Sequence, residues 1–295
     1  RNTYHVYTDD LDLRSRERLE LRNRLQVAIQ NEEFSLHYQP QFELGSGRLC
    51  GIEALLRWNH PELGQVAPNR FIPVAEETGQ IVPIGEWVLR EACRQAADWV
   101  QRGLIDCPMA VNISGLQFVR PQFEQTVKAA LTGSGLEPAR LELELTESVM
   151  MDQSGRAMEV LHRLRALGVR MSIDDFGTGF SSLSYLKRMP VDKIKIDRAF
   201  VTDITTNAED ASITLSIIAM AHHLGLKVIA EGVESEAQLN YLRRHLCDEG
   251  QGYLFSRPLE RAEFEAYLRS PRTHGARAQD DDTGQRPTLL LVDDE

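Results

Sequence analysis

Eight short apolar segments recur along this chain of 295 residues, and segments of helical pattern separate most of them. The apolar segments are rich in Val, Ile and Leu, as is typical of parallel strands that are buried on both faces. They cover residues 36–42, 49–58, 109–113, 141–146, 169–173, 193–196, 227–230 and 252–255. The helical patterns between them cover residues 87–101, 118–131, 156–167, 208–224 and 236–246. Strands that alternate with helices in this number predict an α/β fold, a (β/α)8 TIM-type barrel.

The first two strands depart from this alternation. Only residues 43–48, with the sequence Glu-Leu-Gly-Ser-Gly-Arg, connect them. A parallel crossover needs about a dozen residues or more, whereas a short connection with glycines is typical of a hairpin. We therefore expect a modified barrel whose first two strands are antiparallel.

The chain is expected to hold one barrel with a short piece of sequence on each side. Residues 1–14 are polar and follow neither a helical nor a strand period. The barrel and a joining helix before it are expected within residues 15–269. A charged linker that contains Gly and Pro follows at residues 270–286, and residues 287–295 are typical of one buried strand that ends in acids.

Composition narrows the class of protein. Hydrophobic residues make up 42% and charged residues 26%, as in soluble globular proteins. The sequence has no apolar run long enough to span a bilayer, and its first residues lack the apolar region of a signal peptide. We therefore expect a cytoplasmic segment, although a longer parent protein could be anchored in a membrane. The four cysteines form no C-x-x-C pair and are expected to be reduced.

Net charge bears on the binding partner. The formal charge is −11, and no basic stripe compensates it, so a nucleic acid polymer is not an expected partner. An acidic protein that binds a smaller phosphate ester needs cations at its site. This requirement favours bound metal ions.

Acidic and amide side chains gather where the predicted strands end, which is the end of a barrel that carries catalytic residues. They are Glu53, Asn112, Glu144 and Glu147, the pair Asp174-Asp175, Lys195 and Asp197, Glu231 and Glu234, and Gln251. Converging carboxylates repel one another unless a cation binds between them. Hard oxygen ligands favour Mg²⁺ or Mn²⁺ over zinc, and adjacent aspartates can bridge two metal ions.

Each of these residues also has a simpler interpretation. Glu53 alone would be a solvated residue at a strand edge, and Asp174-Asp175 before glycine would be an ordinary turn. Alternation places Lys195 and Asp197 on the same face of their strand, where they could form a structural ion pair. The joint pattern favours a site, because these residues recur at the same end of successive strands.

At these positions the chain resembles the EAL-domain cyclic di-GMP phosphodiesterases, over about residues 15–269. The motifs that carry the resemblance, in order, are Tyr38-Gln39-Pro40, Glu53-Ala54-Leu55-Leu56-Arg57, Asn112-Ile113-Ser114, Glu144-Leu145-Thr146-Glu147-Ser148, Asp174-Asp175-Phe176-Gly177-Thr178-Gly179, Lys195-Ile196-Asp197, Ala230-Glu231-Gly232-Val233-Glu234 and Gln251-Gly252-Tyr253. The resemblance implies hydrolysis of the bacterial second messenger cyclic di-GMP to linear 5′-pGpG. A non-catalytic cyclic di-GMP receptor and a regulatory interaction domain remain the alternatives.

The resemblance also implies roles for the matching residues. The ligands of a first metal ion would be Glu53, Asn112, Glu144 and Asp174; Asp174 would bridge to a second ion on Asp175, with Glu231 near it. The ions would be Mg²⁺ or Mn²⁺, and Ca²⁺, whose coordination is larger and looser, is expected to inhibit. The catalytic residues would be Lys195, which orients the attacking water, Glu231 as general base, Glu147 and Glu234. The substrate contacts would be Gln39, Leu55, Arg57, Asp197 and Gln251, with Arg57 on a phosphate.

Glu147 has a further expected function. It stands at the end of a strand beside the glycine-rich segment 176–182. A carboxylate can accept hydrogen bonds from the backbone N–H groups of such a segment. The resemblance associates such a glutamate with ordering of this loop and with homodimer contacts. The alternative is that Glu147 stabilises the start of the following helix.

The two ends of the chain resemble parts of other signalling modules. Residues 1–7 resemble the last strand of a GGDEF domain, which the joining helix at 15–30 would follow. Residues 289–295 resemble the first strand and acidic pocket of a receiver domain. The resemblance therefore implies neighbouring signalling domains on both sides in a parent chain.

Overall fold

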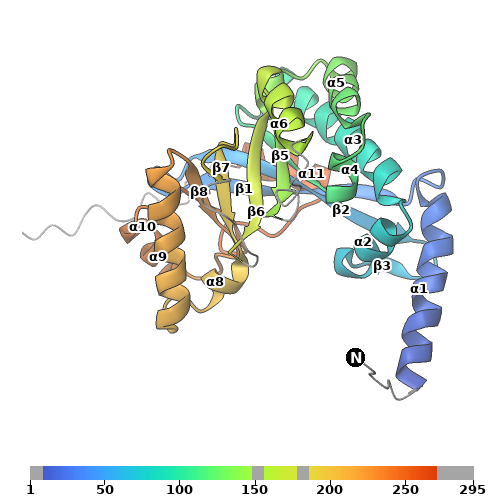
Figure 1. Cartoon of the computed structure of the whole chain (residues 1–295), viewed down its shortest axis with the longest axis horizontal. Helices are drawn as coiled ribbons and strands as arrows, with labels where there is room; N and C mark the ends of the chain where they lie inside the picture. The colour runs from blue at the N-terminus through green and yellow to red at the C-terminus, as the bar shows by residue number, and fades with distance from the viewer. Residues whose placement is uncertain (1–8, 148–155, 178–185, 271–295) are drawn as a thin grey trace, which may run out of the picture.

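A mixed β/α barrel forms the body of the protein (Figure 1). The computed structural model describes residues 9–147, 156–177 and 186–270. The strands are β1 (Phe34–Glu43), β2 (Leu49–His60), β3 (Gly64–Val66), β4 (Met109–Ile113), β5 (Leu141–Thr146), β6 (Arg170–Phe176), β7 (Lys193–Ile196), β8 (Lys227–Ala230) and β9 (Glu249–Gly250). The helices are α1 (Asp9–Ala28), α2 (Pro68–Glu77), α3 (Ile81–Gln101), α4 (Gly115–Phe118), α5 (Phe123–Ser134), the short 3-10 helix η1 (Pro138–Arg140), α6 (Arg156–Ala166), α8 (Arg198–Thr202), α9 (Ala208–His223), α10 (Glu236–Arg244) and α11 (Arg261–Arg269).

The strand order confirms the predicted fold class. Strands β4 to β9 run parallel to one another and to β2, in the order β2-β4-β5-β6-β7-β8-β9. Strand β1 is antiparallel to both of its neighbours, β2 and β9, and closes the barrel between them. Strand β3 extends β2 as a hairpin at the edge. The antiparallel first pair is thus confirmed.

The interior of this barrel is polar, and its apolar side chains face outward. Along β5, Glu142 and Glu144 alternate with the buried Leu141, Leu143 and Leu145. Successive side chains of a strand point to opposite faces, so one face of β5 carries the acids and the other the leucines. The outward leucines belong to the hydrophobic core, which also takes in the buried side chains of α3, α5 and α6. Burial of the outward faces against the helices therefore holds the polar inward faces together.

Several element boundaries differ from the predictions. The eighth barrel strand was expected at residues 252–255, but it is Glu249–Gly250, and residues 252–255 form a turn after it. A side chain at Gly252 would approach the backbone of Val233 to 2.2 Å, and this close approach carries the chain out of the barrel. Helix α1 begins at Asp9 rather than at Ser15, and the region expected to be helical at 118–131 is divided into α4 and α5. Helices α2, α8 and α11 and the strand β3 were not predicted.

Expectations for residues 1–8, for the linker at 271–286 and for the receiver-like strand at 287–295 lie outside the described residues. Among the helices that the structure describes, none combines the length and the apolar character needed to cross a membrane.

Candidate active site

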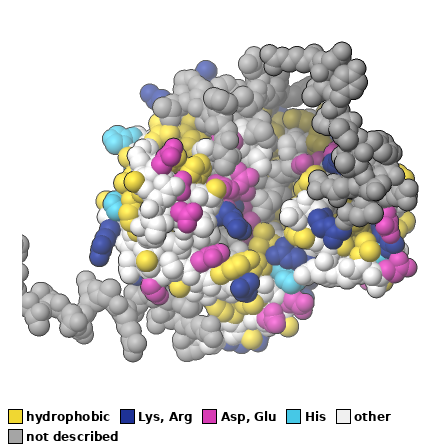
Figure 2. Space-filling model, turned by 90° about the horizontal axis from the view of Figure 1, so that it is seen from below, with side chains coloured by type: hydrophobic (Ala, Val, Ile, Leu, Met, Phe, Trp, Pro, Cys, Tyr) yellow, Lys and Arg dark blue, Asp and Glu magenta, His cyan; other side chains and the backbone are white. Residues whose placement is uncertain are grey.

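Polar side chains from successive strands meet at the carboxyl end of the barrel. The strands supply one side chain each, namely Glu53 from β2, Asn112 from β4, Glu144 from β5, Asp174 from β6 and Lys195 from β7, and Glu231 follows β8. Their registers align them, since Asn112 pairs with Glu144 and Thr146 with Asp174. In a view from below, acidic and basic side chains lie beside one another around a hollow in the surface (Figure 2). These strand-end side chains therefore converge in the structure, as the sequence predicts.

Lys195 lies at the centre of this cluster and is 1% exposed. Its Nζ is 2.7 Å from Glu144 Oε2, 2.7 Å from Glu231 Oε1 and 3.1 Å from Asp174 Oδ1. Glu53 Oε1 is farther away, at 3.8 Å. The ammonium group thus contacts acids from four places around the barrel, and the expected structural pair of Lys195 with Asp197 is not among these contacts.

Three carboxylates form a smaller group beside Lys195. One oxygen each of Asp174, Asp175 and Glu231 lies within 4.8 Å of the others. Asp175 has a φ of 54°, a left-handed conformation that is uncommon for a residue with a side chain. Its N–H donates to Asp174 Oδ1 at 3.0 Å, so the two carboxylates remain next to each other. Asp197 caps the start of α8 by accepting from Ala199 N–H, and it also forms a hydrogen bond with Asp175.

The pKa values of these groups reflect burial and mutual charge. Burial lowers the pKa of Lys195, but the surrounding acids more than offset this and raise it well above its usual value. Burial raises the pKa of Glu231 to about 8, against the opposing charge of Lys195. Burial and the neighbouring Asp174 raise the pKa of Asp175 to about 6. Burial and the charge of Glu53 raise that of Glu144 well above its usual value.

Glu53 differs from the other acids because several donors surround it. Burial by itself raises its pKa, but the charge of Lys195 and hydrogen bonds from Gln251 and Asn112 bring the net value below normal. Asn112 Nδ2 donates to Glu53 Oε1 at 2.6 Å, and Gln251 Nε2 donates to Glu53 Oε2 at 2.5 Å. Gln251 Nε2 also donates to Gln39 Oε1 at 2.9 Å, so two expected substrate contacts adjoin the acidic cluster.

Strand β2 carries further expected substrate contacts. Glu53, Leu55 and Arg57 alternate onto one face of β2, and the last two are half-buried. Arg57 Nη1 donates to the carbonyl oxygen of Leu56 at 2.9 Å, and within the described part of the chain Arg57 forms no ion pair. Tyr253 lies close enough to Arg57 to affect its pKa, and the guanidinium of Arg257 lies 4.3 Å from the centre of the Tyr253 ring.

Two expected catalytic residues stand apart from the cluster. Glu147 directly follows β5 and is buried, and neither of its carboxylate oxygens has a hydrogen-bond partner among the described residues. Its expected partners in the loop at 178–182 lie outside the described residues, so its role stays a prediction. Glu234 is exposed, and its backbone N–H donates to Gln238 Oε1. The structure does not bring the Glu234 carboxylate into contact with the described side chains of the cluster.

Sequence reasoning missed Gln41 and Gly51. Gln41 is 1% exposed and donates from Nε2 to Gln251 Oε1 at 2.9 Å, which places it directly behind the cluster. Strand alternation was the available signal, because Gln41 is two residues after Gln39 and shares its face. Gly51 pairs with Gln41 across the hairpin and leaves space for its side chain.

The cluster fits hard divalent cations. Its donors are carboxylate and amide oxygens, and the described groups with metal-ligand spacing contain no His or Cys. Such a donor set suits Mg²⁺ or Mn²⁺. Five acids, Glu53, Glu144, Asp174, Asp175 and Glu231, face one ammonium group, so the cluster as a whole favours additional positive charge.

A closed mixed barrel with a carboxylate and lysine cluster at the carboxyl ends of its strands defines a class of α/β-barrel proteins with oxygen-rich metal sites. The family model described as EAL domain matches residues 22–258, which is most of the chain, and the chain therefore belongs to the EAL domain family.

Relatives of known name support this membership. The chain is similar to the bifunctional diguanylate cyclase/cyclic di-GMP phosphodiesterase MucR of Pseudomonas aeruginosa, with 45% identity over 88% of this chain and 38% of that protein. It is similar to the cyclic di-GMP phosphodiesterase NbdA of the same organism, with 43% identity over 94% of this chain and 35% of that protein. The chain thus spans little more than a third of the length of these curated relatives.

A solved structure shares the fold at similar identity. It is described as PaMucR phosphodiesterase in complex with c-di-GMP, and it superposes with a TM-score of 0.81 at 46% identity. The match covers 83% of this chain and 99% of that one.

Proposed function

We propose that the protein is a phosphodiesterase that hydrolyses cyclic di-GMP. Family membership supports this, as do the names of MucR and NbdA and the bound ligand in the description of the MucR structure. The observation that carries the proposal is the contact of Lys195 with Glu144, Asp174 and Glu231 at the mouth of the barrel. A module that only binds the nucleotide would not need such a buried lysine among several acids.

Two divalent cations would occupy the oxygen-rich cluster. Glu53, Asn112, Glu144 and Asp174 would hold one ion, and Asp174, Asp175 and Glu231 the other. Bound there, the ions supply positive charge to the phosphate oxygens and make a nearby water a better nucleophile. We assign them as Mg²⁺ or Mn²⁺ from the donor set alone.

The protein side chains supply the remaining steps. Arg57, half-buried and without an ion pair among the described residues, is suited to a phosphate oxygen. Gln39, Leu55, Asp197 and Gln251 would position the dinucleotide. Glu231 would take a proton from the attacking water. Lys195 would orient that water through a hydrogen bond.

The expected product is linear 5′-pGpG. Water attacks phosphorus and one P–O3′ bond breaks, so the released 3′ oxygen takes up a proton and the 5′ phosphate stays on the product. Residues 1–14 and 287–295 would belong to neighbouring GGDEF-like and receiver-like domains of a parent chain, and the barrel would form a homodimer.

Incubation of the purified protein with cyclic di-GMP and Mg²⁺, followed by chromatography of the nucleotides, tests the proposal. We expect pGpG to accumulate with Mg²⁺ or Mn²⁺ and to be absent with excess chelator. Ca²⁺ is expected to support binding but not hydrolysis. Tight binding of cyclic di-GMP without hydrolysis under any metal would instead identify a receptor.

A further inference from the structure

Glu53 depends on a glutamine for one of its hydrogen bonds. Gln251 Nε2 donates to Glu53 Oε2, and Gln251 is 4% exposed. A carboxylate can only accept, so the amide nitrogen of Gln251 must point toward Glu53. This contact fixes the orientation of the Gln251 amide and leaves its oxygen on the opposite side.

The oxygen of Gln251 faces Gln41, deeper in the barrel. Gln41 Nε2 donates to Gln251 Oε1 at 2.9 Å, and Gln41 is 1% exposed. A buried carbonyl without a donor costs free energy, so the donor of Gln41 stabilises the orientation that Glu53 requires. A chain of polar groups therefore runs from Gln41 through Gln251 to Glu53.

The hairpin of β1 and β2 leaves space for these hydrogen-bonded side chains. Gly51 on β2 pairs with Gln41 on β1, and a Cβ atom at Gly51 would lie 2.3 Å from Gln41 Oε1. The φ of Gly51 is not in the left-handed region, so glycine serves here to leave space rather than to allow an unusual backbone.

We infer that Gln41 is a positioning residue, which holds the Gln251 amide so that its nitrogen faces Glu53 and Gln39. The inference rests on the proposed function, in which Glu53 is a metal ligand and Gln39 a substrate contact. Without the donor of Gln41, only the acceptors Glu53 and Gln39 still hold the Gln251 amide, and its buried oxygen loses its donor, so the reversed orientation becomes less unfavourable. In the reversed orientation its oxygen would face the Glu53 carboxylate, and like partial charges would displace that ligand.

The hydrogen bonds that link Gln41, Gln251 and Glu53 cross the seam where the barrel closes. Gln41 belongs to β1, and Gln251 directly follows β9 on the other side of that seam. Gln41 thus acts on Glu53 from the neighbouring strand through Gln251, and among the described residues no hydrogen bond joins Gln41 to a proposed metal ligand.

The test compares Gln41→Met, which keeps the length of the side chain but removes the donor, with the parent protein. Binding of Mn²⁺ to the metal-free protein and turnover of cyclic di-GMP are both measured. We expect Mn²⁺ affinity and kcat each to fall about tenfold, the usual effect of one lost buried hydrogen bond partner. Gln41→Asn, whose shorter side chain withdraws the donor, serves as a second variant if Gln41→Met does not fold.

The same substitution in a Gln251→Met background separates positioning from general stability. If Gln41 acts through Gln251, Gln41→Met changes Mn²⁺ affinity and kcat less than twofold there. Gln95→Met is the matched control, because Gln95, like Gln41, is buried and has an amide oxygen without a hydrogen-bond partner among the described residues, but it lies on α3. We expect it to leave Mn²⁺ affinity and kcat unchanged.

Parental Mn²⁺ affinity and kcat in Gln41→Met would overturn the inference, and so would equal losses in both backgrounds. Failure of the proposed function is a separate result. An inactive parent protein would contradict the proposed phosphodiesterase activity. The Mn²⁺ measurements would still decide whether Gln41 positions Glu53.

Discussion

One ammonium group, Nζ of Lys195, serves as the counter-charge for the acids of the site. It is within 3.1 Å of oxygens from Glu144, Asp174 and Glu231 and is fully enclosed. Its raised pKa keeps it charged in the metal-free protein. Lys195 therefore supplies part of the positive charge that bound cations would supply, and on the proposed function the lysine and the metal ions would compete for the same oxygens.

Lys195→Met tests this competition. Removal of the ammonium leaves the acids without a cation, so Mn²⁺ should bind to the variant at least as tightly as to the parent. Turnover should fall by a factor on the order of 100 or more, because the attacking water would no longer be oriented. Calorimetric Mn²⁺ titration and a kcat measurement check both parts, and weaker Mn²⁺ binding in the variant would contradict the competition.

Asp174→Asn tests whether the acids serve catalysis or the fold. The variant leaves Lys195 paired with Glu144 and Glu231 and removes one of several like charges. We expect hydrolysis to be lost while the melting temperature of the metal-free protein stays within a few degrees of the parent or rises. A large fall in that melting temperature would show that Asp174 holds the fold.

The pH dependence follows from Glu231. Its pKa is about 8 in the folded metal-free protein and 4.5 in its usual state, so the folded protein holds a proton that the unfolded chain has lost between these values. Linkage then requires that the stability of the metal-free protein falls as pH rises through this window. Metal ions displace that proton, so Mn²⁺ affinity should rise between pH 6 and pH 8 by about tenfold or more. Titrations across this range check the slope, and a flat profile would contradict the raised pKa.

At the scale of residues, the sequence predicts the site better than its surroundings. The acids and Lys195 could be identified because each stands at the end of an apolar run. Gln41 could not, since its role depends on the direction of one amide, Gln251, that lies 210 positions away in the chain. The catalytic role of Glu234 stays a prediction, because a position after a strand end does not fix whether a side chain turns inward.

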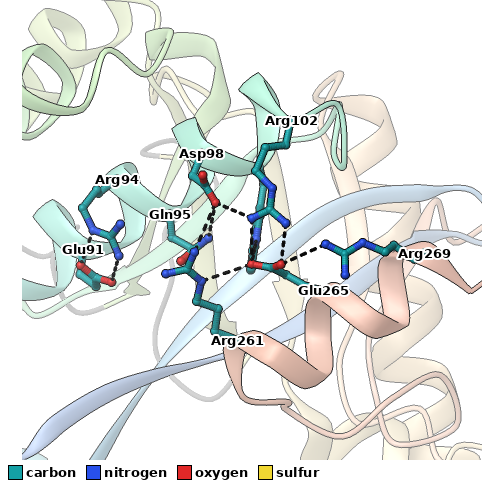
Figure 3. Close-up of polar contacts among 9 residues, drawn as sticks. Glu91, Arg94, Gln95, Asp98, Arg102, Arg261, Glu265 and Arg269 are labelled. Atoms are coloured by element: carbon teal, nitrogen blue, oxygen red, sulfur yellow. Dashed lines mark hydrogen bonds and ion pairs between the residues drawn. The ribbon is translucent and has the colours of Figure 1, made fainter.

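Among the elements, α11 shows how the last helix is attached to the barrel. Glu265 on α11 accepts from Arg102 Nη2, directly after α3, at 2.6 Å (Figure 3). It also accepts from Trp99 Nε1 on α3 at 3.1 Å. Arg261 and Arg269, on the same side of α11, also donate to Glu265 (Figure 3). The hydrogen bonds from Arg102 and Trp99 hold the pKa of Glu265 far below its usual range.

Glu265→Ala should therefore lower stability without touching the site. The variant removes the acceptor of the Trp99 N–H and of Arg269, which we expect to cost about 1–3 kcal/mol. Thermal unfolding of the variant measures the loss. Glu86→Ala on α3, whose carboxylate forms no hydrogen bond or ion pair with the described residues, is a control that should change the melting temperature little. Equal effects of both would argue against the specific role of Glu265.

The eighth barrel strand, β9, was predicted a few residues too late in the sequence, and its neighbouring residues show why. Tyr253, Leu254 and Phe255 form an apolar run that is typical of a strand, whereas Glu249 and Gly250 are not. Leu254 N–H donates to the Val233 carbonyl, so the apolar run packs beside the segment after β8 instead of extending the sheet. Tertiary contact to the Val233 backbone, permitted by Gly252, decides the outcome, and local pattern does not contain that information.

For the whole molecule, the fold class could be predicted from the sequence. The positions of the charged side chains inside the barrel could be predicted only in part. Alternating apolar segments and the short connection at 43–48 are enough for a mixed barrel. The inward layer below the site, in which Lys193 lies 3.3 Å from Glu142 and 2.6 Å from Glu249, was not predicted. Such ion pairs become visible only when strands distant in sequence are placed in register.

Metal binding should stabilise the molecule as a whole. A ligand that binds only the folded state adds about 2.7 kcal/mol when its concentration is 100 times its dissociation constant. We therefore expect Mn²⁺ to raise the melting temperature of the parent, and to raise that of Asp174→Asn much less. Calorimetry of both proteins with and without chelator provides the measurement. An equal rise in both would place the stabilising ion elsewhere.

The closure of the barrel at β1 and β9 has a consequence for how the chain reaches its native state. This seam consists of the pairs Phe42 with Gly250 and Glu43 with Glu249. Its two sides are far apart in the sequence, and few backbone contacts join them. The hairpin of β1 and β2 is local and forms at little entropic cost, whereas the seam closes a loop that contains nearly all of the barrel. The contact between Gln39 and Gln251 crosses the same seam. Nascent chains still leaving the ribosome thus cannot assemble the pocket until the last strand has emerged, and a partly synthesised barrel is catalytically silent.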